Sequence, residues 1–369
     1  MTLIAAINAD ETPAVFGDLV ISSAWESGRA VRVPAVGDAT SVFPAGFGRA
    51  IRDVEQKLVL LADNCAVAWS GTETVARTIV SELRAIASQV PLTSSAIAEY
   101  LSKLDPIDQR QVTFVGWVHE GDHFEQFWFN ASIGEGALFG RIAAGGTGAD
   151  AFVGLASQIS VGPTGQVSTM NGLDRVVVSL LSAMGWLFRA ELGSQSTLLN
   201  LFGGGYEIAT FVGNKFEKIG DVLFIFWSAV VSDARLVELK VPSLIMKQDY
   251  EGETLLLQTL RVGPGKTAAD PPATVKEKYV IGPFGTARAE LELRDIHWPG
   301  MEARYICHVT FVHSPYGGGL LTRINCNPSR ASDDIRISVS GDEMTFWASQ
   351  EFCHSLTESV RTGYAGPAT

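Results

Sequence analysis

The sequence predicts an α+β protein in which two packed β-sheets carry helices on their outer faces, a four-layer αββα arrangement, with a mainly β domain appended. Over about the first 230 residues, strand-like and helical patterns follow in the order strands, two helices, strands, two helices, strands. Beyond about residue 232, short alternating strands are separated by Pro- and Gly-rich pieces. With 369 residues, 46% of them hydrophobic, the chain is long enough for two domains, which we expect at residues 1–235 and 240–369.

The N-terminal part is expected to contain two hairpins on either side of a long loop. Apolar, partly β-branched residues predict a strand over 2–7, and a Thr-Pro turn separates it from a second strand over 14–22. Residues 23–50 are rich in Gly, Pro, Ala and Ser, and a loop of this length inside a compact domain is often functional. A second hairpin over 57–71 turns at Asp63-Asn64.

After this hairpin, the apolar residues recur with the period of a helix. The stretch TETVARTIVSELRAIAS places Ile79 and Leu83 on one apolar face, and Ser70, three residues before Glu73, resembles a capping box at the start of this helix. Further helices are expected at 95–104, 148–160 and 173–192, and further strands at 111–120, 123–130, 137–146, 206–213 and 221–231, the last of which closes the first domain. In the second domain we expect a flexible linker at 262–274 and strands at 277–282, 287–296, 303–312 and 333–340.

Composition excludes several classes of function. A net charge of -12 argues against a nucleic-acid or anionic-membrane surface, because both require clustered Lys and Arg. Acidic residues interrupt the first apolar run before a signal peptide forms, and the run at 221–231 is too short to span a bilayer, so we expect a soluble, cytoplasmic protein. The four cysteines show no CxxC spacing, which argues against a disulfide scaffold or a zinc site.

Three residues of the N-terminal half suggest nucleophilic chemistry. Methionine before a small residue is normally removed, so Thr2 is expected to begin the mature chain, where its own α-amine, with a pKa near about 8, can take the hydroxyl proton. Asp18 is a rare charge in an apolar strand, and Lys57 is the only lysine among the first hundred residues. An ammonium beside Thr2 would lower the pKa of its amine, with Asp18 compensating the burial of that charge. A β-prone threonine, a solvated carboxylate and an exposed lysine are the alternative interpretations.

Over residues 2–230 these positions resemble the proteasome β subunits and their bacterial relatives, the threonine members of the N-terminal nucleophile (Ntn) hydrolases. Asp18 follows Thr2 by 16 residues and Gly71 follows Lys57 by 14, as in that family, and Gly146-Thr147-Gly148 resembles its Gly-Ser-Gly element. The resemblance implies that Thr2 attacks a peptide or amide carbonyl. It also implies that Asp18 and Lys57 set the protonation of the amine, that the Gly71 N–H stabilises the oxyanion, and that Thr147 orients the amine or a water. It implies a homo-oligomer, because relatives form rings, and it implies no cofactor or metal.

The chain departs from this family in three places. The interval from Asp18 to Lys57 is 39 residues and much longer than in the family, so residues 23–50 are an insertion beside the site. The family's Asp-x-x-Ser-Gly pattern falls on 200–204, where Asn200 and Gly203 replace the aspartate and the serine. The β-rich domain has no counterpart in a minimal β subunit. Two other functions therefore stay open: a scaffold or binding protein that keeps the fold without catalysis, and an acyl or peptidyl transferase that uses the same nucleophile.

Overall fold

The computed structural model describes residues 2–9, 11–24, 31–40, 42–43, 46–158, 172–263, 273–286, 296–327, 329, 332–340 and 343–364. The chain forms two compact units. The first unit comprises Met1–Ile219, Gly252–Thr254 and Ile281–Arg294, and the second comprises Gly220–Glu251, Leu255–Val280 and Asp295–Thr369. Both units combine helices with largely antiparallel sheets, which confirms the expected mixed α+β class.

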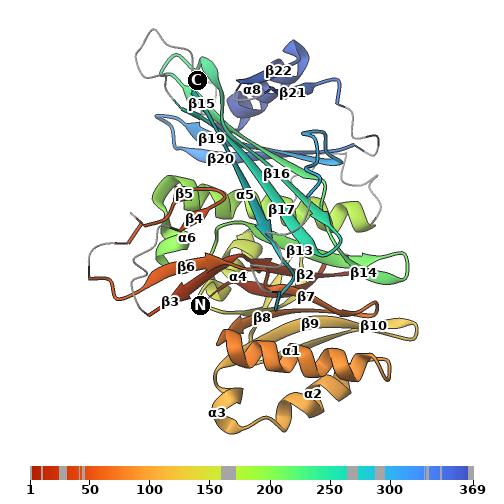
Figure 1. The fold of residues 1–369 in the computed structure, drawn as a ribbon. Helices are drawn as coiled ribbons and strands as arrows, with labels where there is room; N and C mark the ends of the chain where they lie inside the picture. Colours follow the sequence, from red (N-terminus) through yellow and green to blue (C-terminus); the bar gives the residue numbers. More distant parts are fainter. Residues whose placement is uncertain are drawn as a thin grey trace. The chain divides into compact units, whose positions relative to one another are not determined.

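Two sheets form the centre of the first unit (Figure 1). The larger has the strand order β11-β12-β1-β2-β13-β14, and the smaller has the order β10-β9-β8-β7. Their strands are β1 (Ile4–Ala9), β2 (Thr12–Asp18), β7 (Leu58–Ala62), β8 (Cys65–Gly71), β9 (Val112–Glu120), β10 (His123–Phe129), β11 (Ser132–Gly136), β12 (Gly140–Gly145), β13 (Tyr206–Val212) and β14 (Lys215–Lys218). The strands expected in this region are confirmed, and β11 and β14 are additional.

The two sheets share an apolar core. Side chains from both sheets meet there, and most are small or β-branched: Ile4, Ala6, Val15, Ala66, Ala68, Val115 and Ala143. β1 and β2 also bury their outward-facing residues, so nearly every position in them is inaccessible to solvent. This burial on both faces explains why these strands are continuously apolar instead of alternating with polar residues.

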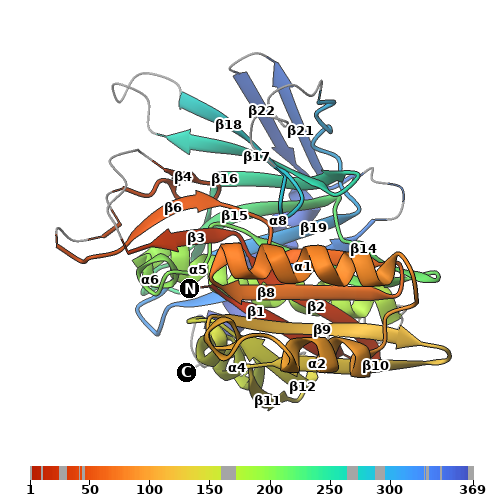
Figure 2. The same ribbon diagram turned by 60° about the horizontal axis from the view of Figure 1, so that its bottom comes forward.

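Helices contact the outer faces of both sheets (Figure 2). The smaller sheet contacts α1 (Glu73–Ala87) and α2 (Ser94–Ser102), and the larger contacts α4 (Ala149–Gln158) and α5 (Gly172–Ser194). Short helices α3 (Pro106–Gln109) and α6 (Ser196–Leu199) complete the unit. The expected helices are thus confirmed as elements.

The expected capping box of α1 is wrong. β8 runs through Gly71, so Ser70 lies inside a strand and the helix begins at Glu73 with Thr72 as its N-cap. The Glu73 carboxylate instead pairs with Arg77, at 2.7 Å, and with Arg52. The apolar face was predicted correctly, since Ile79 and Leu83 are buried.

The expected long loop at 23–50 contains more regular structure than its composition indicates. β3 (Val20–Ser23) pairs with β6 (Ala50–Val54), and β4 (Arg32–Val33) pairs with β5 (Gly37–Asp38). Val33, Ala39 and Ile51 are buried in a small cluster of their own. Residues 25–30, 41, 44 and 45 lie outside the described residues.

α5 is the one described helix that is long and apolar enough to cross a bilayer, but 67% of its most apolar window is buried inside the protein. Its buried face includes Leu180, Leu181 and Phe188, and it packs against β13 and β2. α5 is thus mostly a core helix of the first unit.

The second unit is built on a sheet with the order β18-β17-β16-β15-β19-β20. Its elements are β15 (Val222–Val231), β16 (Val237–Glu251), β17 (Thr254–Gly263), β18 (Ala273–Ile281), β19 (Tyr305–His313), β20 (Gly319–Cys326), the hairpin of β21 (Ile335–Ser340) and β22 (Glu343–Ala348), and α8 (Gln350–Tyr364). Leu223, Ile225 and Trp227 pack with Phe352 and Leu356 of α8 in one apolar core.

The second unit differs from the expectation in two respects. β15 was expected to close the first domain, but it pairs with β16 on one side and β19 on the other, so the units divide at Ile219/Gly220 and not near residues 235–240. α8 was not expected in a mainly β domain. Most of the strand expected at 287–296 and most of the linker expected at 262–274 lie outside the described residues.

Candidate active site

β1 and β2 bring Thr2 and Asp18 together at one end of their hairpin. Ile4 lies opposite Gly17, and the Asp18 N–H donates to Leu3 O at 3.0 Å. The Thr2 hydroxyl donates to Asp18 Oδ1, which also accepts the Leu3 N–H at 3.0 Å. Gly203 N–H donates to the other carboxylate oxygen at 2.8 Å. Both side chains are buried, so Asp18 is an internal acceptor that orients the Thr2 hydroxyl.

The charge state of Asp18 depends on opposing effects. Complete burial raises the pKa of Asp18 above its usual range, because burial penalises the carboxylate. Lys57 and the hydrogen bonds from Thr2, Leu3 and Gly203 lower it. Lys57 and these hydrogen bonds therefore favour the carboxylate form, against the effect of burial.

Lys57 immediately precedes β7 and is buried, with 1% of its surface exposed. Among the described residues its Nζ has no hydrogen-bond partner, and it lies 4.8 Å from the centre of the Trp69 ring. Burial lowers the pKa of Lys57, while the carboxylates of Asp18, Glu55, Glu207 and Glu73 raise it. An amine without hydrogen bonds in such a place is costly as a structural element, and this cost suggests a chemical role.

A cavity of about 210 Å³ is lined by Thr2, Lys57 and Gly71, together with Ile21, Ser22, Arg52, Trp69, Thr72 and Glu73. Gly71 ends β8 with φ +110, and a Cβ there would lie 2.0 Å from Gln111 O. Only glycine fits this backbone, which turns from β8 toward α1. The structure thus places three of the residues selected from sequence around one small, polar cavity.

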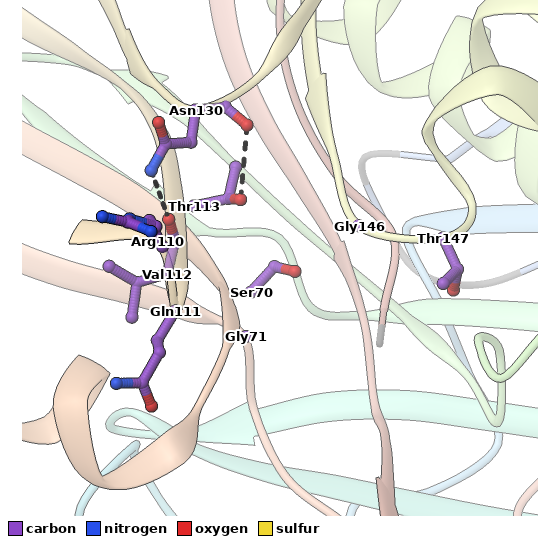
Figure 3. A pocket seen from close by; sticks show the side chains of 9 residues that line it. All are labelled: Ser70, Gly71, Arg110, Gln111, Val112, Thr113, Asn130, Gly146 and Thr147. Atoms are coloured by element: carbon purple, nitrogen blue, oxygen red, sulfur yellow. Dashed lines mark hydrogen bonds between the residues drawn. The ribbon is translucent and has the colours of Figure 1, made fainter. Parts of the chain in front are cut away.

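A second cavity, of about 560 Å³, lies on another side of Gly71 (Figure 3). Gly71, Ser70, Gly146 and Thr147 line it, and Figure 3 shows the Ser70 side chain directed into the space between the strand ending at Gly71 and the bend at Gly146. Gly146 is close to Thr2, since a Cβ there would lie 2.1 Å from Thr2 O. The Thr147 hydroxyl donates to Asn200 O at 2.7 Å, and the next residue, Gly148, donates its N–H to Thr2 O at 3.1 Å. Thr147 therefore adjoins Thr2 through the backbone of its neighbours.

The sequence reasoning missed Glu191, a fully buried acid of α5 behind Gly203. Its carboxylate accepts the Gly204 N–H at 3.1 Å and the Thr197 hydroxyl at 3.4 Å. A Cβ on Gly203 would lie 2.3 Å from Glu191 Oε2, so this carboxylate occupies the space in front of the glycine. Burial, together with the negative charge of Asp18, raises the pKa of Glu191 to about 8. In the sequence, Glu191 could have been found as an isolated charge, since α5 has no other acid after Asp174.

Charged side chains surround the entrance of the smaller cavity. Arg77 pairs with Glu55 at 3.1 Å and with Glu73 at 2.7 Å, and Arg52 also pairs with Glu73. Burial raises the pKa of Glu55 to about 7, and Glu73 adds to this effect while Lys57 and both arginines oppose it. A group that binds in this cavity therefore meets paired charges of both signs.

Within the described ranges, no three His, Cys, Asp or Glu side chains are placed to hold a metal ion. The site thus consists of a hydroxyl, a carboxylate, an amine and glycine backbone, which together suit proton transfer and nucleophilic attack. No protein-family model matches this chain, and no curated protein sequence is significantly similar to it.

Proposed function

We propose that this protein is a threonine-nucleophile amide or peptide hydrolase of the Ntn class. The observation that carries the proposal is the buried hydrogen bond from the Thr2 hydroxyl to Asp18, beside a Lys57 amine that has no hydrogen-bond partner among the described residues. A cavity lined by Thr2, Lys57 and Gly71 leaves room for a substrate carbonyl. The two sheets with helices against their outer faces are compatible with the four-layer αββα fold of that class.

In the proposed reaction, removal of Met1 frees the α-amine of Thr2. Rotation of the Thr2 O–H bond redirects the hydroxyl proton from Asp18 to this amine, and Oγ1 forms a bond to the substrate carbonyl carbon. The carbonyl π electrons move to oxygen, and the Gly71 N–H stabilises the resulting oxyanion. When the C–N bond breaks, the leaving nitrogen takes the proton from the Thr2 amine. Water then attacks the carbonyl carbon of the ester and gives one proton to the amine. The bond between this carbon and Thr2 Oγ1 breaks, Oγ1 takes the proton back from the amine, and a carboxylic acid leaves.

Lys57 and Asp18 act on the protonation of the Thr2 amine. A positive charge on Lys57 disfavours a second positive charge nearby, so it keeps the Thr2 amine neutral and basic at neutral pH. Asp18 compensates the buried charge of Lys57 and holds the Thr2 hydroxyl. In this proposal Thr147 positions the backbone around Thr2 through Gly146 and Gly148.

The test is the intact mass of the purified protein before and after exposure to an epoxyketone or a β-lactone. We expect a mass without Met1, one adduct on the wild type, none on Thr2→Ala, and an unchanged adduct on Thr12→Ala, a threonine in the same hairpin. A retained Met1 with no adduct would contradict the proposal and favour a non-catalytic scaffold, as would adduct formation that survives Thr2→Ala.

Acyl transfer is the second candidate, and the larger cavity favours it. That cavity adjoins Gly71 and is big enough for an amine that replaces water in the second step. Adding small primary amines during turnover of an activated amide should then produce new amide products. Only hydrolysis products at high amine concentration would exclude the transferase.

A further inference from the structure

Two short segments from late in the chain belong to the first unit and adjoin Lys57. They are Gly252–Thr254, the turn after β16 with the first residue of β17, and the described part of Ile281–Arg294, which begins at the last residue of β18. A proteasome-like domain that ended near residue 219 would contain neither. Both segments contact residues that neighbour Lys57.

The first contact runs through aromatic rings. Phe284 is 4% exposed and packs in the same core as Trp69, with the two ring centres 4.3 Å apart. The indole of Trp69 lies 4.8 Å from Lys57 Nζ, and the Arg77 guanidinium lies 5.5 Å from the Phe284 ring on its way to Glu55 and Glu73. Phe284 thus packs against the ring that forms the environment of the lysine amine.

The second contact runs through a buried hydrogen-bond network. The Gln56 amide donates to Glu253 O at 2.8 Å and to Ile281 O at 2.6 Å, so one side chain joins both late segments. Gln56 Oε1 accepts from Lys218, whose Nζ lies 3.5 Å from Glu207 Oε1. The other oxygen of Glu207 accepts the N–H of Lys57 at 3.0 Å and that of Leu58 at 3.4 Å. The backbone of Lys57 is therefore fixed by a network that ends on these two segments.

We propose that the segments Gly252–Thr254 and 281–284 are part of the Thr2 site, and that Phe284 and Gln56 are positioning residues that hold Lys57 in its buried place beside the Trp69 ring. Phe284 acts through Trp69, and Gln56 acts through Lys218 and Glu207. This assigns to the chain beyond residue 219 a role in the chemistry of the first unit. The role in catalysis rests on the proposed function, whereas the positioning of Lys57 does not.

The physical effect expected from losing Phe284 is hydration of Lys57. A gap beside Trp69 lets the indole move and more water reach Nζ, and hydration favours the ammonium form. The charged groups that face Lys57 stay in place: Asp18 from β2, Glu55 from the segment before β7, Glu207 from β13 and Glu73 from α1. A change in its titration after substitution of Phe284 therefore reports solvent access and not a lost charge.

The experiment compares Phe284→Ala and Phe284→Leu with Phe346→Ala, which removes a partly buried aromatic ring from the core of the second unit. The titration of Lys57 is followed by NMR of isotope-labelled lysine, with its signal assigned through Lys57→Arg. We expect the pKa of Lys57 to rise by about one unit or more in Phe284→Ala, less in Phe284→Leu, and not at all in Phe346→Ala. The rate of β-lactone adduct formation should fall about ten-fold in Phe284→Ala, because water around Nζ screens its positive charge from the Thr2 amine.

A second variant tests the network without creating a cavity. Gln56→Met keeps the length of the side chain but removes its donors, and we expect faster hydrogen exchange at the Lys57 and Leu58 amides, with exchange in α2 unchanged. A folded Phe284→Ala with the wild-type Lys57 titration, or wild-type exchange in Gln56→Met, would overturn the inference. If the wild type forms no adduct, the proposed function fails, but the titration and the exchange still decide whether these residues position Lys57.

Discussion

Each unit contains a buried lysine with 1% of its surface exposed, and the two differ in how they are satisfied. Lys247 of the second unit donates to Asp221 Oδ1 at 2.6 Å and to Glu302 O at 2.7 Å, with Asp249 at 3.9 Å. Lys57 has no hydrogen bond from Nζ among the described residues, and it borders a cavity beside a hydroxyl. Lys247 has the hydrogen-bond and ion-pair partners that a buried charge with a structural role requires. The comparison thus distinguishes a stabilising ion pair from a buried amine whose lack of hydrogen bonds suggests a chemical role.

The largest effect expected is on activity, from Lys57→Met. Removing the amine leaves the Thr2 amine without its electrostatic partner, and we expect the rate of adduct formation to fall about a hundred-fold or more. Among the described residues Nζ makes no hydrogen bond that the variant would break, and Asp18 is expected to take up a proton once the ammonium is gone, so stability in urea should fall less than in Lys247→Met. The rate is measured by mass spectrometry over time with the β-lactone. A Lys57→Met variant that reacts at the wild-type rate would make Lys57 structural, like Lys247.

The reverse result is expected for Lys247→Met. Loss of the buried ammonium removes a cation from beside Asp221 and a donor to Glu302 O, and breaking one side of a buried pair costs about 3 kcal/mol or more. Urea unfolding monitored by tryptophan fluorescence should show this loss. The adduct rate measured under conditions where the variant is folded should match the wild type, and a rate as low as that of Lys57→Met would remove the distinction between the two lysines.

The third prediction concerns Glu191, the buried acid near Asp18, and the pH dependence of stability. The pKa of Glu191, about 8, lies above the value of about 4.3 expected in the unfolded chain, so the folded protein binds the extra proton between these values. The folded state therefore loses stability as pH rises from about 5 to 8. Glu191→Gln removes this titration, and its free energy of unfolding, measured in urea at several pH values, should fall less steeply than that of the wild type. Parallel curves for the two proteins would show that Glu191 does not titrate in this range.

The smallest effect is expected at the entrance of the smaller cavity. Arg52 is half exposed and its pair with Glu73 faces solvent, so Arg52→Gln should change the free energy of unfolding by less than about 1 kcal/mol. Glu73 keeps its second partner, Arg77, at 2.7 Å. Because Arg52 lines the cavity, we expect the variant to change which electrophiles react fastest, measured with a series of β-lactones that differ in side-chain charge. An unchanged order of reactivity would place the substrate side chain elsewhere.

Local patterns in the sequence predicted most elements of the first unit. The β1–β2 hairpin, α1 and the β9–β10 hairpin were found because period and turn residues are properties of adjacent positions. The same patterns did not show which sheet a strand joins, and β15 was assigned to the wrong unit because an apolar run has the same appearance in either sheet. α8 was missed although Phe352, Leu356 and Val360 recur every four residues, because polar residues dominate the rest of the helix.

By itself, the sequence determined the spacing of Thr2, Asp18, Lys57 and Gly71 and thereby the chemistry that these residues suggest. The tertiary structure decided what surrounds them. Gln56 donates to the carbonyl oxygens of residues 253 and 281, and Trp69 packs against Phe284, so these contacts join positions about two hundred residues apart. Glu191 lies against Gly203, which is nearer in the sequence. Long-range contacts of this kind leave no local period, because burial of a side chain depends on the packing of whole sheets and helices and not on its neighbours in the chain.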